Sequence, residues 1–161
     1  MEKLSAKRKI VAPRRLAAVV ARLKARGQRV VFTNGVFDLL HAGHVTLLEK
    51  ARRLGDALVV GINSDASVRR LKGSKRPLAP VTDRTRVLAG LESVDYVTVF
   101  SENTPLQLIE RLKPTILVKG GDYALNQIVG REAVKRVVRV PLVKGRSTTA
   151  LVAKIVKAYG R

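Results

Sequence analysis

Cysteine and tryptophan are both absent from this chain, and aromatic residues make up only 4% of its 161 residues. The absence of cysteine excludes disulfides and thiolate-bound metal sites, and it suits a cytoplasmic protein, because disulfides are rare in that compartment. The chain also lacks any apolar run near the roughly 18 residues of a transmembrane helix, so we expect no membrane partner. The basic segment 1–9 has no apolar stretch behind it, which argues against a secretory signal.

Acidic residues are scarce: 12 Asp and Glu stand against 32 Lys and Arg, for a net charge of +20 at pH 7. Such an excess attracts polyanions. The basic residues are scattered, however, with short clusters at residues 7–9, 14–15 and 72–76, and no stacking aromatics lie between them. We therefore expect incidental, salt-sensitive binding of polyanions, while a dedicated nucleic-acid-binding module remains the alternative from another functional class.

Hydrophobic residues make up 46% of the chain, enough for the core of one domain. We expect a basic tail over residues 1–12 and a single domain over residues 13–161. Short apolar segments alternate with segments that have helical spacing. The predicted strands are residues 29–33, 57–62, 94–100, 115–118 and 137–143. The predicted helices begin near Pro13 and His44 and at four N-caps, which are Ser64 or Asp65, Thr82, Thr104 and Ser147.

This alternation predicts a Rossmann-like α/β fold, a doubly wound parallel sheet in a three-layer α/β/α arrangement. In such sheets ligands bind beyond the carboxyl ends of the strands, at the point where the strand order changes direction. The polar motifs of the chain follow the ends of predicted strands, so we expect them to gather at that edge.

The strongest motif contains the only two histidines of the chain, His41 and His44, separated by Ala42 and Gly43 at the start of a predicted helix. Small residues let a phosphate approach the backbone, and a helix N-terminus offers unpaired N–H groups and a partial positive charge. Two imidazoles there could donate hydrogen bonds to phosphate oxygens. The alternative is a pair of structural histidines that cap the helix, but the preceding strand and glycine loop favour a phosphate site.

Two further segments have the character of ligand sites. The glycines of the segment Lys119, Gly120, Gly121 and Asp122 permit close approach of a base or ribose, and Asp122 could accept a hydrogen bond from it. A simple turn is the alternative. Hydroxyls at Ser147, Thr148 and Thr149 begin the last predicted helix, which makes them a second anion site or, in the case of Ser147, an ordinary N-cap.

The segment 34–38 together with residues 41–44 resembles the signature of the HxGH nucleotidylyltransferase superfamily, and residues 145–149 resemble its second phosphate-binding motif. Within that superfamily, the D-glycero-β-D-manno-heptose 1-phosphate adenylyltransferases are similar at residues 61–67, 70–73, 76–77 and 117–123. The resemblance covers residues 29–157.

That resemblance implies transfer of AMP from ATP to the heptose 1-phosphate, which yields ADP-heptose and pyrophosphate for lipopolysaccharide core or similar surface glycans. We expect the stand-alone form of the enzyme, because 161 residues leave no room for the sugar kinase to which many bacteria fuse it. Relatives often form homodimers, so a homodimer is a further expectation. Glycerol-3-phosphate cytidylyltransferases share the two phosphate motifs and are the nearest alternative, although residues 63–67 and 119–123 favour the heptose enzymes.

Residue roles follow from the resemblance. It implies that His41 and His44 hold the triphosphate and that Lys72 reaches its phosphates, all three as catalytic residues. Asp38 would lie near a bound Mg²⁺ ion. The implied nucleotide-binding residues are Thr33, Asn34, Gly35, Phe37, Gly43, Lys119, Gly120, Asp122, Ser147, Thr148 and Thr149. The implied supports of substrate or phosphate are Asp65, Arg76 and Arg84.

Three of these roles have plainer alternatives. Asp38 could be a loop aspartate that accepts hydrogen bonds from backbone N–H groups, Lys72 a surface lysine, and Arg84 a surface charge on a helix. The chain offers no good covalent nucleophile, so we expect direct in-line attack of the sugar phosphate on ATP, catalysed by positioning and charge stabilisation. Mg²⁺ would bridge the triphosphate.

Overall fold

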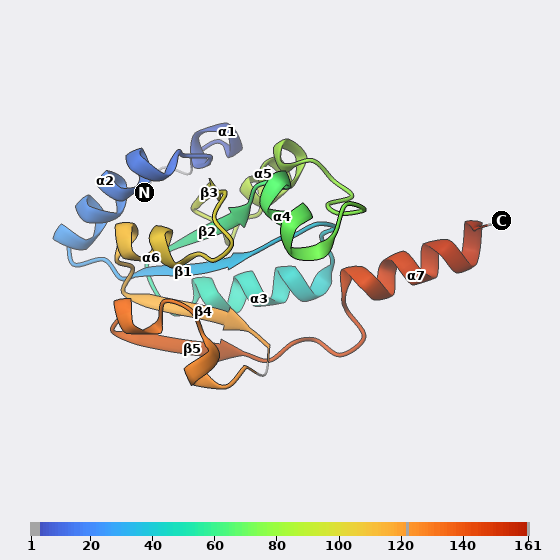
Figure 1. The fold of residues 1–161 in the computed structure, drawn as a ribbon. Helices are drawn as coiled ribbons and strands as arrows, with labels where there is room; N and C mark the ends of the chain where they lie inside the picture. The colour runs from blue at the N-terminus through green and yellow to red at the C-terminus, as the bar shows by residue number, and fades with distance from the viewer. Residues whose placement is uncertain (1–3, 122, 161) are drawn as a thin grey trace.

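The computed structural model describes residues 4–121 and 123–160. Within these residues five strands form one sheet in the order β3-β2-β1-β4-β5, and every pairing is parallel. The strands are β1 (Val30–Gly35), β2 (Ala57–Asn63), β3 (Tyr96–Phe100), β4 (Ile116–Gly120) and β5 (Arg136–Val140). The predicted doubly wound α/β fold is therefore confirmed (Figure 1).

Helices cover both faces of the sheet (Figure 1). They are α1 (Ala6–Lys9), α2 (Pro13–Ala25), α3 (Ala42–Arg52), α4 (Asp65–Lys72), α5 (Val81–Gly90), α6 (Leu106–Leu112) and α7 (Thr148–Tyr159), with short 3₁₀ turns at Leu125–Gln127 and Arg131–Ala133. Because side chains alternate along a strand, Val30 and Phe32 pack with α2 and α6, whereas Val31 packs with α3 and α5. The two layers of Leu, Val and Ile thus form two cores, one on each side of the sheet.

The segment before Pro13 is folded, so the expectation that residues 1–12 form a tail outside the domain is wrong for residues 4–12. Ile10 forms a bridge to Val97 of β3, and the N–H of Val11 donates to the Val97 carbonyl at 2.9 Å. The ammonium of Lys9 donates to the carbonyl of Leu91 at 3.0 Å. Leu4 and Val11 pack against the core on the α2 side. These apolar contacts hold residues 4–12 against the domain, although their positive charge had led us to expect a tail.

Two of the predicted N-caps are confirmed by the structure and two are wrong. Ser64 and Ser147 each accept a hydrogen bond from the third residue of their helix, as predicted. Thr82 is instead the second residue of α5, because Pro80 takes the cap position. Thr104 also caps nothing, since Pro105 is the residue before α6, which begins at Leu106.

Helix α7 extends away from the sheet, and none of its described residues is buried (Figure 1). None of the helices in the described part of the chain has the length and apolar character needed to cross a bilayer.

Candidate active site

The candidate site lies where β1 and β4 lie side by side at the centre of the sheet. The chain runs outward from β1 through β2 to β3 on one side and from β4 to β5 on the other, so this is the switch point of the strand order. The loop after β1 leads into α3, and the turn after β4 lies beside it: a side chain at Gly120 would meet Leu47 of α3 at 3.1 Å. Two of the predicted motifs therefore meet at this edge.

The two histidines stack on each other at the start of α3. Their ring centroids are 3.9 Å apart at an angle of 23°. His41 occupies the N-cap position, yet its side chain does not cap the helix. The Nδ1 atoms of His41 and His44 are both buried and have no hydrogen-bond partner among the described residues. The capping alternative is therefore not supported for His41, and the helix start it precedes remains available to a ligand.

Both imidazoles favour the neutral form. Burial, and then the charge of His41, lowers the pKa of His44 to about 4. Burial, and then the nearby Arg146 guanidinium, lowers the pKa of His41. A neutral imidazole keeps one N–H donor, and the negative charge of a bound triphosphate would favour protonation of either ring.

The space next to Gly43 is filled, so a residue with a side chain would collide with its neighbours there. A Cβ atom at this position would lie 3.0 Å from two ring atoms of His41 and 3.2 Å from the Cβ of Arg146. The structure thus brings Arg146, from the segment before α7, against the histidine motif. Sequence reasoning did not assign Arg146 a role, although it lies inside the segment 145–149 that resembled a phosphate motif.

The start of α7 reaches the same loop. The hydroxyl of Thr148 donates to the carbonyl of Leu39 at 3.4 Å, and Ser147 caps the helix by accepting from the N–H of Ala150 at 3.1 Å. Thr149 is exposed. The N-termini of α3 and α7 therefore lie close together, and their free N–H groups make a surface that suits a chain of phosphates.

The residues that end β1 form the floor of the site. Thr33 is fully buried, and its hydroxyl oxygen has no partner within the described residues, while Asn34 and Gly35 are half-buried. Phe37 has a left-handed backbone, with φ of 48°, and the residue is 4% exposed. The ring covers Gly35 and lies 5.1 Å from the ring of His44. The side chain of Phe37 is thus part of the core.

The end of β4 and the turn that follows it lie beside the loop after β1. Burial lowers the pKa of Lys119, and its ammonium lies 5.7 Å from the ring centroid of Tyr123. Gly121 has φ of 111°, a value that favours glycine, and its N–H donates to the carbonyl of Val140 at 3.0 Å. The turn reading is therefore correct for Gly121, and it leaves the half-buried Lys119 and Gly120 free for a ligand. Asp122 lies outside the described residues.

The three predicted supports Asp65, Arg76 and Arg84 are bonded to other groups of the protein. Arg84 is 1% exposed, and its guanidinium donates hydrogen bonds to three acceptors in the protein. One of them is Asp65. Arg76 pairs with Asp38 at 2.8 Å. Both expectations for Arg84, substrate contact and surface charge, differ from what the structure shows.

Lys72 and Asp38 complete the set of predicted residues. Lys72 is exposed on the last turn of α4, and no hydrogen bond or ion pair within residues 4–121 and 123–160 joins it to the histidines. The oxygens of Asp38 accept from Leu78, Ala79 and Arg76, which is the loop-aspartate alternative. Across the described residues no group of three or more His, Cys, Asp or Glu is arranged to hold a metal ion.

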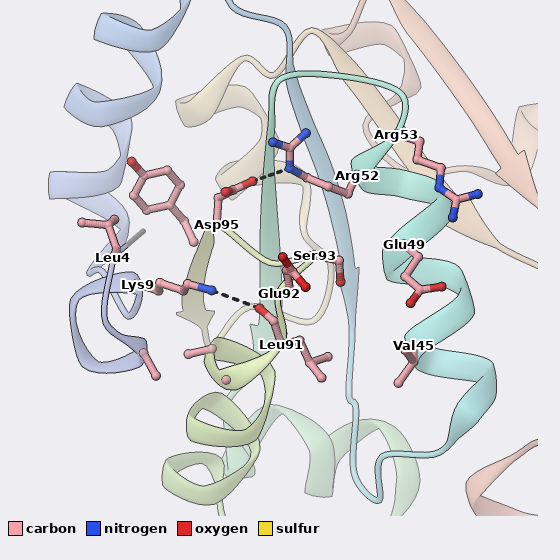
Figure 2. A pocket seen from close by; sticks show the side chains of 14 residues that line it. Leu4, Lys9, Val45, Glu49, Arg52, Arg53, Leu91, Glu92, Ser93 and Asp95 are labelled. Atoms are coloured by element: carbon pink, nitrogen blue, oxygen red, sulfur yellow. Dashed lines mark hydrogen bonds and ion pairs between the residues drawn. The ribbon is translucent and has the colours of Figure 1, made fainter. Parts of the chain in front are cut away.

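A groove of about 910 Å³ lies elsewhere, between α1, the carboxyl half of α3 and the segment before β3 (Figure 2). Arg52 there pairs with Asp95 at 2.9 Å, and Lys9 is bound to Leu91, so much of its charge is satisfied inside the protein. None of the residues that line it is one of the predicted site residues.

Fold and site together define an α/β nucleotidyltransferase, with a stacked histidine pair at a helix N-terminus at the sheet's switch point. Residues 32–157 match the family model described as cytidylyltransferase-like, and the chain belongs to that family.

Curated relatives are similar over most of the chain. It is 60% identical to "Bifunctional protein HldE" of Geobacter sulfurreducens and 56% identical to the protein of that name in Geobacter metallireducens, in each case over 90% of this chain. The chain spans only 30% of the length of these two relatives. Among solved structures, the lipopolysaccharide core biosynthesis protein from Thermoplasma volcanium is 28% identical, with a TM-score of 0.62 over 73% of this chain and all of that one.

Proposed function

We propose that this chain transfers AMP from ATP to D-glycero-β-D-manno-heptose 1-phosphate, giving ADP-heptose and pyrophosphate. The observation that carries the proposal is the stacked histidine pair between the N-termini of α3 and α7, with Arg146 beside it. The relatives named for lipopolysaccharide core biosynthesis and for a bifunctional protein support the sugar substrate. The proposal includes a cytoplasmic location, where ATP and sugar phosphates are available.

The reaction needs no covalent intermediate. An oxygen of the sugar 1-phosphate is already an anion, so it attacks the α-phosphorus of ATP without a general base. The new P–O bond forms as the bond from the α-phosphorus to the bridging oxygen breaks, and pyrophosphate leaves with that electron pair. His41 and His44 donate hydrogen bonds to the phosphate oxygens on which charge accumulates, and Arg146 adds positive charge beside them.

Magnesium enters this proposal with the substrate. The described side chains offer no cluster of ligands for it, and Mg²⁺ in such sites is commonly held by substrate phosphates, water and at most one or two carboxylates. We therefore assign its binding mainly to the triphosphate. We do not assign Asp38 to the metal, because its oxygens accept hydrogen bonds from Arg76, Leu78 and Ala79.

The test is a turnover assay with purified protein, Mg²⁺, ATP or CTP, and either the heptose 1-phosphate or glycerol 3-phosphate. We expect pyrophosphate and ADP-heptose from ATP with the heptose acceptor. The variant His44→Ala should fold normally and lose about two to three powers of ten in kcat, as when one preorganised donor is removed. CDP-glycerol as the main product would move the protein to the cytidylyltransferase alternative, and full activity of His44→Ala would refute the site.

A further inference from the structure

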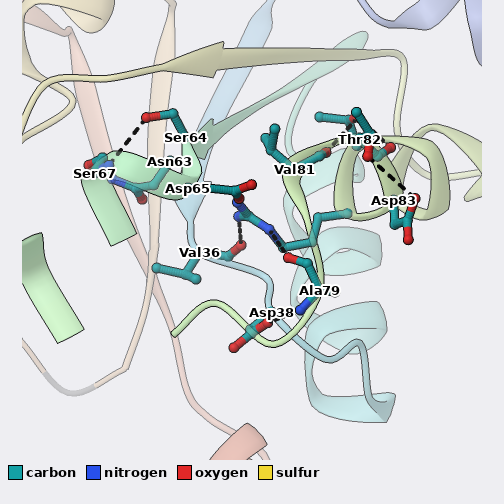
Figure 3. A network of polar contacts seen from close by, with 12 residues as sticks. Val36, Asp38, Asn63, Ser64, Asp65, Ser67, Ala79, Val81, Thr82 and Asp83 are labelled. Atoms are coloured by element: carbon teal, nitrogen blue, oxygen red, sulfur yellow. Dashed lines mark hydrogen bonds and ion pairs between the residues drawn. The ribbon is translucent and has the colours of Figure 1, made fainter. Parts of the chain in front are cut away.

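Arg84 is a fully buried arginine whose three acceptors come from three different segments (Figure 3). Its Nε donates to the carbonyl of Ala79 at 2.9 Å, its Nη1 to the carbonyl of Val36 at 2.7 Å, and its Nη2 to a carboxylate oxygen of Asp65 at 2.5 Å. A buried guanidinium is costly unless its donors are satisfied. Each of these acceptors is therefore held where it is: one in the loop after β1, one at the start of α4, and one in the loop before α5.

Asp38 meets the loop before α5 from the other side. One carboxylate oxygen accepts from the N–H groups of Leu78 at 2.8 Å and Ala79 at 3.0 Å, and the other accepts from Arg76 at 2.8 Å. Burial by itself would raise the pKa of Asp38, but the hydrogen bonds from Ala79, Arg76 and Leu78 outweigh it and hold the pKa below its usual value. Asp38 thus stays ionised and bonded to this loop.

The two sets of contacts meet at Ala79 and bracket Phe37. The N–H of Ala79 donates to Asp38 while its carbonyl accepts from Arg84. In the loop after β1, Val36 and Asp38 are the residues on either side of Phe37. Phe37 has φ of 48°, a conformation that a residue with a bulky side chain keeps only when its surroundings impose it. Its ring lies against His44, with centroids 5.1 Å apart.

We propose that Arg84 and Asp38 are positioning residues, which join the loop before α5 to the turn at residues 36–38 and thereby hold Phe37 against His44. The kinetic part of this inference rests on the proposed function, but the structural part does not. It gives Arg84 and Asp38 a role that neither substrate contact nor metal binding supplies. Asp65 and Arg76 act in the same junction, as partners of the two central residues.

Loosening this junction has a specific expected effect on one histidine. If Phe37 leaves its left-handed conformation, its ring no longer shields His44, and water reaches the imidazole. Since burial is the main cause of the low pKa of His44, that pKa should rise toward its ordinary value. The titratable group that faces His44 is His41, which in turn faces the Arg146 guanidinium.

The experiment titrates the two histidines by NMR between pH 3 and pH 8 in the complete chain, which is practical because it has only two. The variants are Arg84→Lys, which cannot reach three acceptors, and Asp38→Asn, which keeps the shape but loses the charge. The matched control is Arg52→Lys, because Arg52 also joins a carbonyl, that of Gly55, to a carboxylate, that of Asp95, but away from the site. His44→Gln assigns the resonances.

We expect Arg84→Lys and Asp38→Asn to raise the pKa of His44 by about 1 or more, and Arg52→Lys to leave it unchanged. In the turnover assay the same two variants should lower kcat about tenfold or more, with a smaller change in KM for ATP, because the histidine is misplaced rather than the nucleotide site lost. Should Arg84→Lys not fold, Asp38→Asn carries the test.

An unchanged titration of His44 in folded Asp38→Asn or Arg84→Lys protein overturns the proposal, whatever the activity. So does an equal rise in Arg52→Lys, since the effect would then be general destabilisation. The titration needs no turnover, so an inactive wild-type protein with the expected titrations would refute the proposed reaction and leave the positioning role supported.

Discussion

Adding one methyl group at Gly43 should separate catalysis from stability at this site. The Cβ of a Gly43→Ala variant would lie 3.0 Å from the Cε1 and Nδ1 atoms of His41 and 3.2 Å from the Cβ of Arg146. Such distances require the neighbours to move by a few tenths of an ångström. The His41 ring is the movable group, and it is stacked on His44 at 3.9 Å, so the displacement passes to the second histidine.

The two consequences have opposite signs. Gly43 is the second residue of α3 and has an ordinary helical backbone, so alanine should favour the helix by up to about 1 kcal/mol. The close contacts offset part of that gain, and the free energy of unfolding should change by less than about 1 kcal/mol. The rate should fall about 100-fold, because a catalytic group misplaced by a fraction of an ångström to an ångström loses much of its effect.

The control is Gly90→Ala, in α5, where a Cβ would meet nothing within 4 Å. Urea unfolding and the pyrophosphate-release assay are measured on both variants and on the wild type. Gly90→Ala should keep wild-type kcat. The reasoning fails if Gly43→Ala keeps wild-type kcat as well, or if it loses activity only in proportion to a loss of folded protein.

Three other perturbations test separate features. The pKa of His44 is about 4 in the folded state and higher in the unfolded chain, so the unfolded state takes up the proton first as the pH falls. The free energy of unfolding should therefore be highest above about pH 6.5 and fall by about 1 kcal/mol toward pH 4. Urea titrations should show a smaller decrease for His44→Gln. Ser147→Ala removes the cap of α7, a helix with no buried residue, so hydrogen exchange should quicken in α7 with little change in Tm. Ser64→Ala removes the cap of α4, which packs against the protein, so it should lower Tm. Equal effects of the two variants on Tm and on hydrogen exchange would contradict this prediction. With a net charge of +20, binding of duplex DNA in fluorescence anisotropy should weaken steeply between about 50 and about 200 mM salt, and binding that persists at the higher salt would instead favour a dedicated nucleic-acid function.

The fold could be predicted because strand, helix and turn signals agree along most of the chain. Apolar strands such as residues 57–62 are buried on both faces, which only a covered parallel sheet explains. The switch point followed from this, and with it the neighbourhood of the histidine motif. Ser64 and Ser147 were found as caps because a short hydroxyl side chain at a helix start has few other uses.

The errors arose where long-range contacts override a local signal. Residues 4–12 look like a tail because their charge is visible in the sequence and their pairing with Val97 is not. Arg84 shows the same limit more sharply. Its burial depends on Val36, Asp65 and Ala79, which lie on three segments whose relative placement only the folded chain defines. A charged residue on a short helix gives no sign in one sequence that it faces inward.

Attraction of the nucleotide and catalysis are carried by different groups in this site. Residues 3–37 contain ten Lys and Arg and no Asp or Glu, and residues 133–161 contain eight and none. The basic residues of the first segment all precede β1, whereas the second segment contains Arg146 and the start of α7. Arg146 and the N-termini of α3 and α7 therefore supply positive potential beside the phosphate site without help from the histidines. The imidazoles can remain neutral and stacked at 3.9 Å, which two cations would resist, and their N–H groups stay available for the charge that develops during transfer.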